Sequence, residues 1–315
     1  MRPLRVGTRG SALALWQAKT VATLIEKAGA PTEIVVIKTG GDRLQDAPLS
    51  KAGGKGLFVK EIEDALLAGE IDVAVHSAKD MSAVLPDGLA IAAALPREDP
   101  RDALVLRHGN SAIDFDGALA HIGEMPAIGT GSVRRIAQLA ARLPHARFTP
   151  IRGNVDTRLR KLDAGDYEAL VLAAAGLRRL GFESRISATI PVDACVPAPG
   201  QGIVAIEIRG DDRAVRDAVA PLSDGDATSS LAAERAVVAA LGGGCQLPLG
   251  VIAEHGGDGL RVQGVVAWPD GRGLIRRAAT GPATDPAAAG ARLADELLRA
   301  GADEILNAVR TGVTP

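Results

Sequence analysis

The segment VAVHSAKD, residues 73–80, ends an apolar strand pattern in a run of polar residues. Polar groups at the carboxyl end of a strand lie at the edge where α/β sheets bind ligands. Asp80 could act there as a general acid or base, or it could cap a helix that begins at Met81. Lys79 could in principle form a Schiff base with a carbonyl compound. His76 has no second His or Cys at ligand spacing, so the sequence predicts no metal site.

The two cysteines have different surroundings. Cys245 lies in GGGCQLP, residues 242–248, where the glycines leave its sulfur open to close approach. Cys195 lies in DACVPAP, among apolar residues typical of a buried and unreactive thiol. We therefore expect covalent chemistry at Cys245 rather than at Cys195. Two cysteines are too few for a disulfide framework or a zinc site built from cysteines.

Several cationic side chains fall at predicted strand ends or first helical turns rather than on exposed helix faces. Such positions line the ligand edge of α/β folds, where helix N-termini also present N–H groups to anions. Arginine can hold a carboxylate through two hydrogen bonds. These cations form either an anion-binding cleft or solvated surface charge: Arg9, Lys55, Lys79, Arg134, Arg135, Arg152 and Arg158.

The segment GTGSVRR, residues 129–135, follows a predicted strand and opens a helix. A dinucleotide fingerprint would place a third glycine where Arg134 stands, so a nucleotide site is weakly supported. Two consecutive arginines in a first helical turn oppose the helix dipole unless an anion offsets them. RGNVDTR, residues 152–158, supplies a similar arrangement. Both segments favour a ligand that carries several negative charges.

Alternating strands and helices position these residues. The alternation predicts two α/β regions, each with a parallel sheet covered by helices. The first has strands at 4–8, 33–38 and 71–75 and helices from Ser11 and near 58–68; the second has strands near 127–128, 147–151 and 169–173 and helices from Ser132, from Val155 and near Leu177. After Pro221, a long helix from Ser229, a hairpin near 255–257 and a helix over 286–300 indicate a smaller α+β module.

The composition is that of an ordinary globular protein. With 315 residues, 47% of them hydrophobic, the chain can form two or three domains. We expect a cytoplasmic protein, because the first residues lack the pattern of a secretory signal and no run approaches about 20 apolar residues. A net charge of −2 and an aromatic content of 2% argue against a nucleic-acid partner. The lack of a long apolar run argues against a membrane partner.

Ten segments in this order resemble the porphobilinogen deaminase (hydroxymethylbilane synthase) family. They span nearly the whole chain: GTRGSALALWQA, KAGGKGLFVKEIEDAL, VHSAKD, REDPRDA, GTGSVRR, RGNVDTRL, LAAAGLRRLG, PGQG, AERA and GGGCQLPLG. The chain departs from the family pattern at three positions. Gly131 replaces a usual Ser, Ser82 a common Pro, and Pro199 a small or β-branched residue.

The resemblance implies an α/β fold in which two domains like periplasmic binding proteins face a cleft, with a smaller C-terminal α+β domain. We place domain 1 at residues 1–99 and 200–220, the inserted domain 2 at 100–199, and the C-terminal domain, which carries the cofactor cysteine, at 221–315. The family's members act on porphobilinogen as a small-molecule substrate. We expect a monomer.

The resemblance also implies the activity and its residues. Four porphobilinogen molecules are joined head to tail, with release of ammonia, on a dipyrromethane cofactor bound by a thioether to Cys245; water then releases hydroxymethylbilane. Asp80 matches the catalytic residue. The family's counterparts for cofactor and substrate binding are Arg9, Ser11, Lys55, Ser77, Lys79, Thr130, Ser132, Arg134, Arg135, Arg152, Gly153, Arg158, Arg179 and Gln201.

Two other functions stay open from the residues alone. An anion-binding or regulatory protein would keep the cationic cleft but would need neither Asp80 nor a modified Cys245. A nucleotide-dependent oxidoreductase would use GTGSVRR and would bind a nicotinamide cofactor in solution.

Overall fold

The computed structural model describes residues 2–39, 59–107, 114–243, 247–257 and 259–312. The chain divides into two compact units, one made of Met1–Glu98 with Ile203–Thr228 and the other of Asp99–Gly202 with Ser229–Pro315. Each unit has its own apolar clusters around its own sheets.

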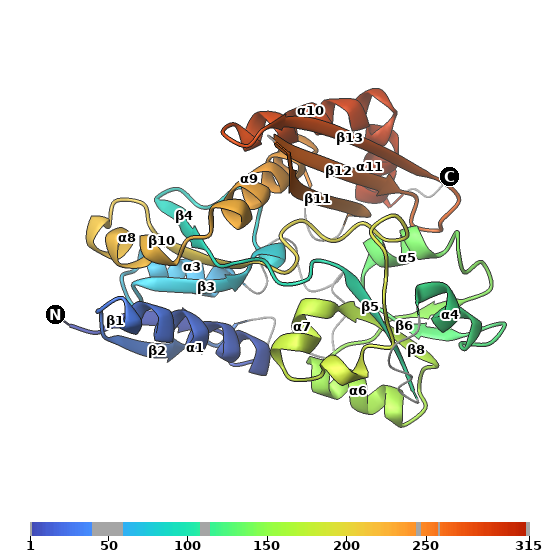
Figure 1. The fold of residues 1–315 in the computed structure, drawn as a ribbon, viewed down its shortest axis with the longest axis horizontal. Coiled ribbons are helices and arrows are strands. Elements are labelled where there is room, and N and C mark those ends of the chain that lie inside the picture. Colours follow the sequence, from blue (N-terminus) through green and yellow to red (C-terminus); the bar gives the residue numbers. More distant parts are fainter. Residues whose placement is uncertain (1, 40–58, 108–113, 244–246, 258, 313–315) are drawn as a thin grey trace. The chain divides into compact units, whose positions relative to one another are not determined.

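The first unit contains a five-stranded sheet in the order β2-β1-β3-β10-β4 (Figure 1). Strand β1 pairs in parallel with β2 and β3, whereas β10 runs antiparallel to both β3 and β4. The strands are β1 (Leu4–Thr8), β2 (Thr32–Val36), β3 (Val73–Ser77), β4 (Leu89–Ala94) and β10 (Val204–Arg209).

Helices cover both faces of this sheet. Apolar residues of α1 (Ala12–Lys27) and α8 (Arg213–Val219) share one buried cluster with the strands. Helix α3 (Lys60–Leu67) covers the opposite face, where Leu66 belongs to the same buried apolar cluster as Ala74 and Leu89. The short 3-10 helices η1 (Ala78–Asp80) and η3 (Ala220–Leu222) follow β3 and α8. The layers of sheet and helices are those that the sequence predicts, but the expectation of a parallel sheet is wrong, because β10 runs antiparallel to both of its neighbours.

The second unit repeats that sheet topology in the order β7-β6-β8-β5-β9. Strand β6 is parallel to β7 and β8, and β5 is antiparallel to its two neighbours. The elements are β5 (Asp102–Leu106), α4 (Phe115–Ala120), β6 (Ala127–Gly129), α5 (Val133–Leu139), β7 (Arg147–Thr149), α6 (Val155–Asp163), β8 (Ala169–Ala173), α7 (Ala174–Arg179), η2 (Glu183–Arg185) and β9 (Ala188–Thr189).

The two sheets exchange one strand connection in each direction. In each sheet, the strand that runs antiparallel to its neighbours comes directly after a strand of the other sheet in the sequence. Strand β5 follows β4 of the first sheet, and β10 follows β9 of the second. Helices α4 and α5 contribute to the apolar cluster on one face of the second sheet, and α6 and α7 to the cluster on the other.

The C-terminal part of the second unit is a three-stranded antiparallel sheet, β11-β12-β13, with helices on one face. Its other face buries Ile252 and Val265 against Val196. An added Cβ at Gly250 would lie 2.5 Å from the carbonyl oxygen of Val196, so only glycine allows this approach. The elements are α9 (Gly225–Ala240), β11 (Leu249–Gly256), β12 (Gly259–Ala267), β13 (Leu274–Pro282), α10 (Pro286–Arg299) and α11 (Ala302–Thr311).

The predicted α/β class with a smaller C-terminal α+β part is confirmed. The three domain boundaries, and a cleft between the first two domains, stay predictions. Helix α9 begins at Gly225 rather than Ser229, and the sequence analysis missed α11. No helix among the described residues is long and apolar enough to cross a membrane.

One buried carboxylate, Asp72, holds the amino end of β3 to its neighbours. Arg2 binds it through both Nη1 and Nη2, each at 2.8 Å, and Arg5 and Arg209 donate further hydrogen bonds. Burial alone would raise the pKa of Asp72, but the hydrogen bonds from Arg2 and Arg5 outweigh it and hold the pKa well below its usual range. The carboxylate is therefore ionised at neutral pH and stabilises the first unit.

Asp72→Asn should lower the free energy of unfolding at pH 7 by about 3 kcal/mol, because the arginines lose their buried counter-charge. The folded-state pKa is depressed, so the wild-type advantage should be complete above about pH 4 and should shrink as pH falls below that value. Urea unfolding at pH 7 and pH 3.5 measures both effects. Asp217→Asn, at an exposed position, is the control; an equal loss in both variants would contradict the assignment.

Candidate active site

The first candidate edge lies at the carboxyl ends of β1 and β3. These strands are parallel neighbours, with Val6 opposite Val73, so the residues that follow them share one edge of the sheet. Arg9 and Ser11 follow β1. Strand β3 ends at Ser77 and continues into η1, which holds Lys79 and Asp80.

Helix α1 helps to define this edge. Ser11 is its N-cap and accepts a hydrogen bond from the Ala14 N–H at 3.3 Å, as the sequence predicts. The buried Gln17 donates from Nε2 to Ser77 Oγ at 2.9 Å. This hydrogen bond joins α1 to the polar end of β3.

Asp80 ends η1 and is partly buried. No helix follows it, since the described residues up to β4 at Leu89 form bends and turns, so the helix-cap alternative is wrong. With the residues that the structure describes, its carboxylate forms neither a hydrogen bond nor an ion pair.

His76 is a buried residue with a structural partner. Its Nε2 lies 2.9 Å from Glu207 Oε2 on β10, and both side chains are almost completely buried. The structure agrees with the expectation that His76 is a hydrogen-bonded strand residue. The described residues contain no group of three or more His, Cys, Asp or Glu that could hold a metal ion.

The second candidate edge lies at the carboxyl ends of the parallel strands β6, β7 and β8. Thr130 and Ser132 follow β6, and Ser132 is the N-cap of α5. Arg152, Gly153 and Arg158 follow β7; the Nε of Arg158 donates to the Gly153 carbonyl at 2.8 Å. Helix α7 continues β8, and its Arg179 donates from Nη2 to the Gly202 carbonyl at 2.7 Å.

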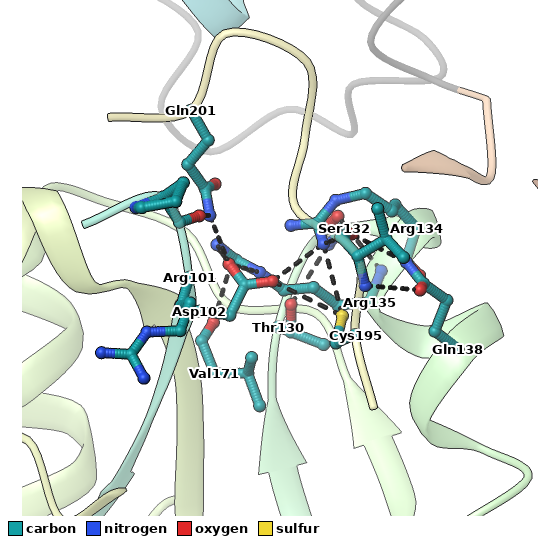
Figure 2. A network of polar contacts seen from close by, with 12 residues as sticks. Arg101, Asp102, Thr130, Ser132, Arg134, Arg135, Gln138, Val171, Cys195 and Gln201 are labelled. Carbon is teal, nitrogen blue, oxygen red and sulfur yellow. Dashed lines mark hydrogen bonds and ion pairs between the residues drawn. The ribbon is translucent and has the colours of Figure 1, made fainter. Parts of the chain in front are cut away.

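Asp102 lies at this edge, because β5 is antiparallel to β8 and Asp102 pairs with Ala173. Figure 2 shows its carboxylate between the guanidinium groups of Arg134 and Arg135. Arg134 Nη1 lies 2.8 Å from Oδ2, and Arg135 binds Oδ1 through Nε at 3.0 Å and Nη2 at 2.8 Å. Gln201 Nε2 donates to Oδ1 at 2.9 Å. Asp102 is fully buried, and each of its partners is nearly so.

The charges of this cluster stabilise one another. Burial alone would raise the pKa of Asp102, but the charges of Arg134 and Arg135 outweigh it and hold the pKa well below its usual range. Burial alone would lower the pKa of Arg134, but its attraction to Asp102 raises the pKa above the usual value. Asp102 and Arg134 are therefore ionised at neutral pH, and Arg135 forms a second ion pair with the same carboxylate, so two guanidinium groups face one negative charge.

Cys195 also contacts this cluster. Its Sγ lies 3.3 Å from Arg134 Nη1 and 3.5 Å from Asp102 Oδ2. Burial raises the pKa of its thiol to about 12, although the charge of Arg134 acts in the opposite direction. The thiol is therefore protonated and unreactive, in agreement with the expectation for Cys195.

Among the described residues, most of the predicted ones follow the carboxyl ends of strands at two sheet edges, one in each unit, and Arg179 is the last residue of α7. Lys55 and Cys245 lie outside the described residues. Asp102 was missed as a site residue, although it stands in the quoted segment REDPRDA. At Gly131 an added Cβ would make only an ordinary contact, 3.4 Å from the Ile151 carbonyl oxygen, so the usual serine would fit.

Comparison with known proteins identifies the family. The family model described as porphobilinogen deaminase, dipyromethane cofactor binding domain, matches residues 4–217, and that of the porphobilinogen deaminase C-terminal domain matches residues 228–299. The chain belongs to the porphobilinogen deaminase family. Porphobilinogen deaminases from two strains of Acidithiobacillus ferrooxidans are each 48% identical to it over 309 residues, covering 98% of both chains. The resemblance seen in the sequence is confirmed.

Solved structures with a similar chain path include solute-binding proteins. An ancestral cationic amino acid solute binding protein matches with a TM-score of 0.40 and 17% identity, covering 70% of this chain and 87% of its own. A substrate-binding domain of a putative amino acid ABC transporter from Streptococcus pneumoniae matches with a TM-score of 0.43 and 13% identity, covering 76% of this chain and 95% of its own.

Native protein treated with iodoacetamide at pH 8 should keep Cys195 unmodified, because a thiol with a pKa of about 12 has almost no thiolate at that pH. Mass spectrometry of peptides measures the modification. The same treatment in urea should alkylate Cys195 fully. Rapid alkylation in the native state would contradict the buried position in the Asp102 cluster.

Proposed function

We propose that the protein is a porphobilinogen deaminase (hydroxymethylbilane synthase). It condenses four porphobilinogen molecules head to tail, releases one ammonia at each addition, and hydrolyses off the linear tetrapyrrole hydroxymethylbilane. The observation that carries this proposal is the 48% identity to porphobilinogen deaminases over 98% of the chain. Both family models, with residues 4–217 and 228–299, support it.

The charges at the second edge fit this substrate. Porphobilinogen carries an acetate and a propionate, so each added unit brings two carboxylates. Arginines suit them, because a guanidinium can bind a carboxylate through two parallel hydrogen bonds. Arg134 and Arg135 together carry one more charge than Asp102. Arg152 follows β7, whereas Arg158 lies in α6 and Arg179 is the last residue of α7, the helices that come after β7 and β8.

The same edge fits the dipyrromethane cofactor, which is also acidic. Thr130, Ser132, Gly153, Gln201 and the arginines of this edge would hold it, and Cys245 would carry it through a thioether bond. When bound, the cofactor supplies the pyrrole carbon to which the first unit is joined.

Asp80 is the catalytic residue in this proposal. As a carboxylic acid it can give a proton to the leaving amino group, and as a carboxylate it can offset positive charge that develops on a pyrrole nitrogen. Its carboxylate forms neither a hydrogen bond nor an ion pair with the described residues. Ser77 and Lys79 lie beside it at the end of β3, and Arg9 and Ser11 follow β1. Lys55, which lies outside the described residues, belongs to the same proposed binding set.

The substrate is a small molecule, and we propose that the protein works as a cytoplasmic monomer with no nucleic-acid or membrane partner. The near-neutral net charge of −2 and the low aromatic content support the absence of a nucleic-acid partner.

The intact mass of the purified protein should exceed the sequence mass by one dipyrromethane, and peptide mapping should place the excess on Cys245. Cys195 should be unmodified because it is buried against Asp102. Electrospray mass spectrometry with peptide sequencing measures both. Protein that forms hydroxymethylbilane with an unmodified Cys245 would contradict the attachment.

Asp80→Asn should reduce kcat by about 10²- to 10⁴-fold, because the amide keeps the size of the side chain but loses its charge and its proton. The melting temperature and the mass on Cys245 should stay close to the wild type. Asp87→Asn, an exposed carboxylate seven residues along the chain, is the matched control. Normal turnover in Asp80→Asn would overturn the catalytic assignment.

A further inference from the structure

The guanidinium groups of Arg134 and Arg135 are held from two sides. Besides its contact with Asp102, Nη1 of Arg134 donates to the Val196 carbonyl at 2.7 Å. Arg135 donates from Nη1 to the Val171 carbonyl at 2.9 Å, while its Nε and Nη2 bind Asp102. Each arginine is thus fixed between one backbone carbonyl and the same carboxylate. Figure 2 shows Val171 and Asp102 beside these guanidinium groups.

The backbone around the cluster is also tied in place. Gln138, one helical turn after Arg134, accepts a hydrogen bond from the Val196 N–H at 2.7 Å and donates one to the Val196 carbonyl at 3.0 Å. Gln201 donates to both Asp102 and the Pro100 carbonyl, the latter at 2.6 Å. The Asp102 carboxylate is therefore held in place by its surroundings, and its hydrogen bonds orient the guanidinium groups of both arginines.

The net positive charge of the cluster favours the binding of an anion. Two ionised guanidiniums share a single carboxylate, so one positive charge is not neutralised within the cluster. A buried net charge is costly unless a counter-charge approaches it. A ligand carboxylate at the end of β6 would supply that counter-charge while Asp102 keeps the guanidiniums oriented.

We propose that Asp102 is a positioning residue that orients Arg134 and Arg135 for the carboxylates of the cofactor and the growing chain. This inference rests on the proposed function. Asp102 does not itself touch the ligand; it acts through the two arginines. Its side chain sets their geometry and leaves one positive charge for the ligand.

Asp72 provides a matched control within the same chain. It is equally buried and is also bound by arginines, namely Arg2, Arg5 and Arg209. It precedes β3, however, so it lies at the amino end of that strand, whereas Asp80 follows the carboxyl end. A purely structural role for Asp102 predicts that Asp102→Asn and Asp72→Asn behave alike.

The test compares these two variants at a temperature where both are folded, judged by circular dichroism. Three quantities are measured on each: the fraction of Cys245 carrying the dipyrromethane mass, kcat and KM for porphobilinogen, and the melting temperature. Both variants should melt below the wild type. In Asp102→Asn the loaded fraction should fall, or kcat of the loaded protein should fall by about 100-fold, because a misplacement of about 1 Å suffices for such a loss. In Asp72→Asn both should stay close to the wild type, because Asp72 lies at the amino end of β3, away from the carboxyl ends of the strands that the site residues follow.

Asp102→Glu keeps the charge but lengthens the side chain, so it covers the case in which Asp102→Asn does not fold. It should be folded and should still show the drop in loading or in kcat. Normal loading and normal kcat in a folded Asp102→Asn or Asp102→Glu would overturn the inference, as would equal losses in the Asp72 control. Failure of the proposed function itself is separate, because it would appear in the wild type as an unloaded Cys245 or as no hydroxymethylbilane.

Discussion

A buried carboxylate shared by two arginines is the interaction on which the second unit's site depends. Asp102 begins β5, and its position opposite Ala173 places it at the edge where β6, β7 and β8 end. Because it is ionised and fully buried, it fixes both guanidiniums there without neutralising them both. The arginines thus serve the fold and the ligand together, so their substitution should affect stability as well as binding.

The sheet topology explains why the site residues gather where they do. In each unit three parallel strands present their carboxyl ends at one edge, and the residues with suitable chemistry follow those ends. The antiparallel fourth strand brings in a segment distant in sequence. In the second unit this segment begins with Asp102, which the fold places beside residues more than thirty positions along the chain.

The sequence was sufficient to predict the α/β layers, Ser11 as a helix cap, the loops after β3 and β6, and the buried character of Cys195. Local spacing determines these features, so a single sequence contains them. The partners of Arg134 and Arg135 could not be predicted, because Asp102 reaches them only through the pairing of β5 with β8. The sequence around Asp80 was also compatible with a role of this residue as a helix cap. Only the bends and turns that follow η1 in the structure exclude that role.

The most direct measurement is a crystal structure of the protein with its cofactor covalently bound. The account predicts a ligand carboxylate oxygen about 3 Å from a guanidinium nitrogen of Arg134 or Arg135, with both side chains still bonded to Asp102. Ligand carboxylates bound elsewhere, with both arginines contacting only Asp102 and the backbone, would contradict it.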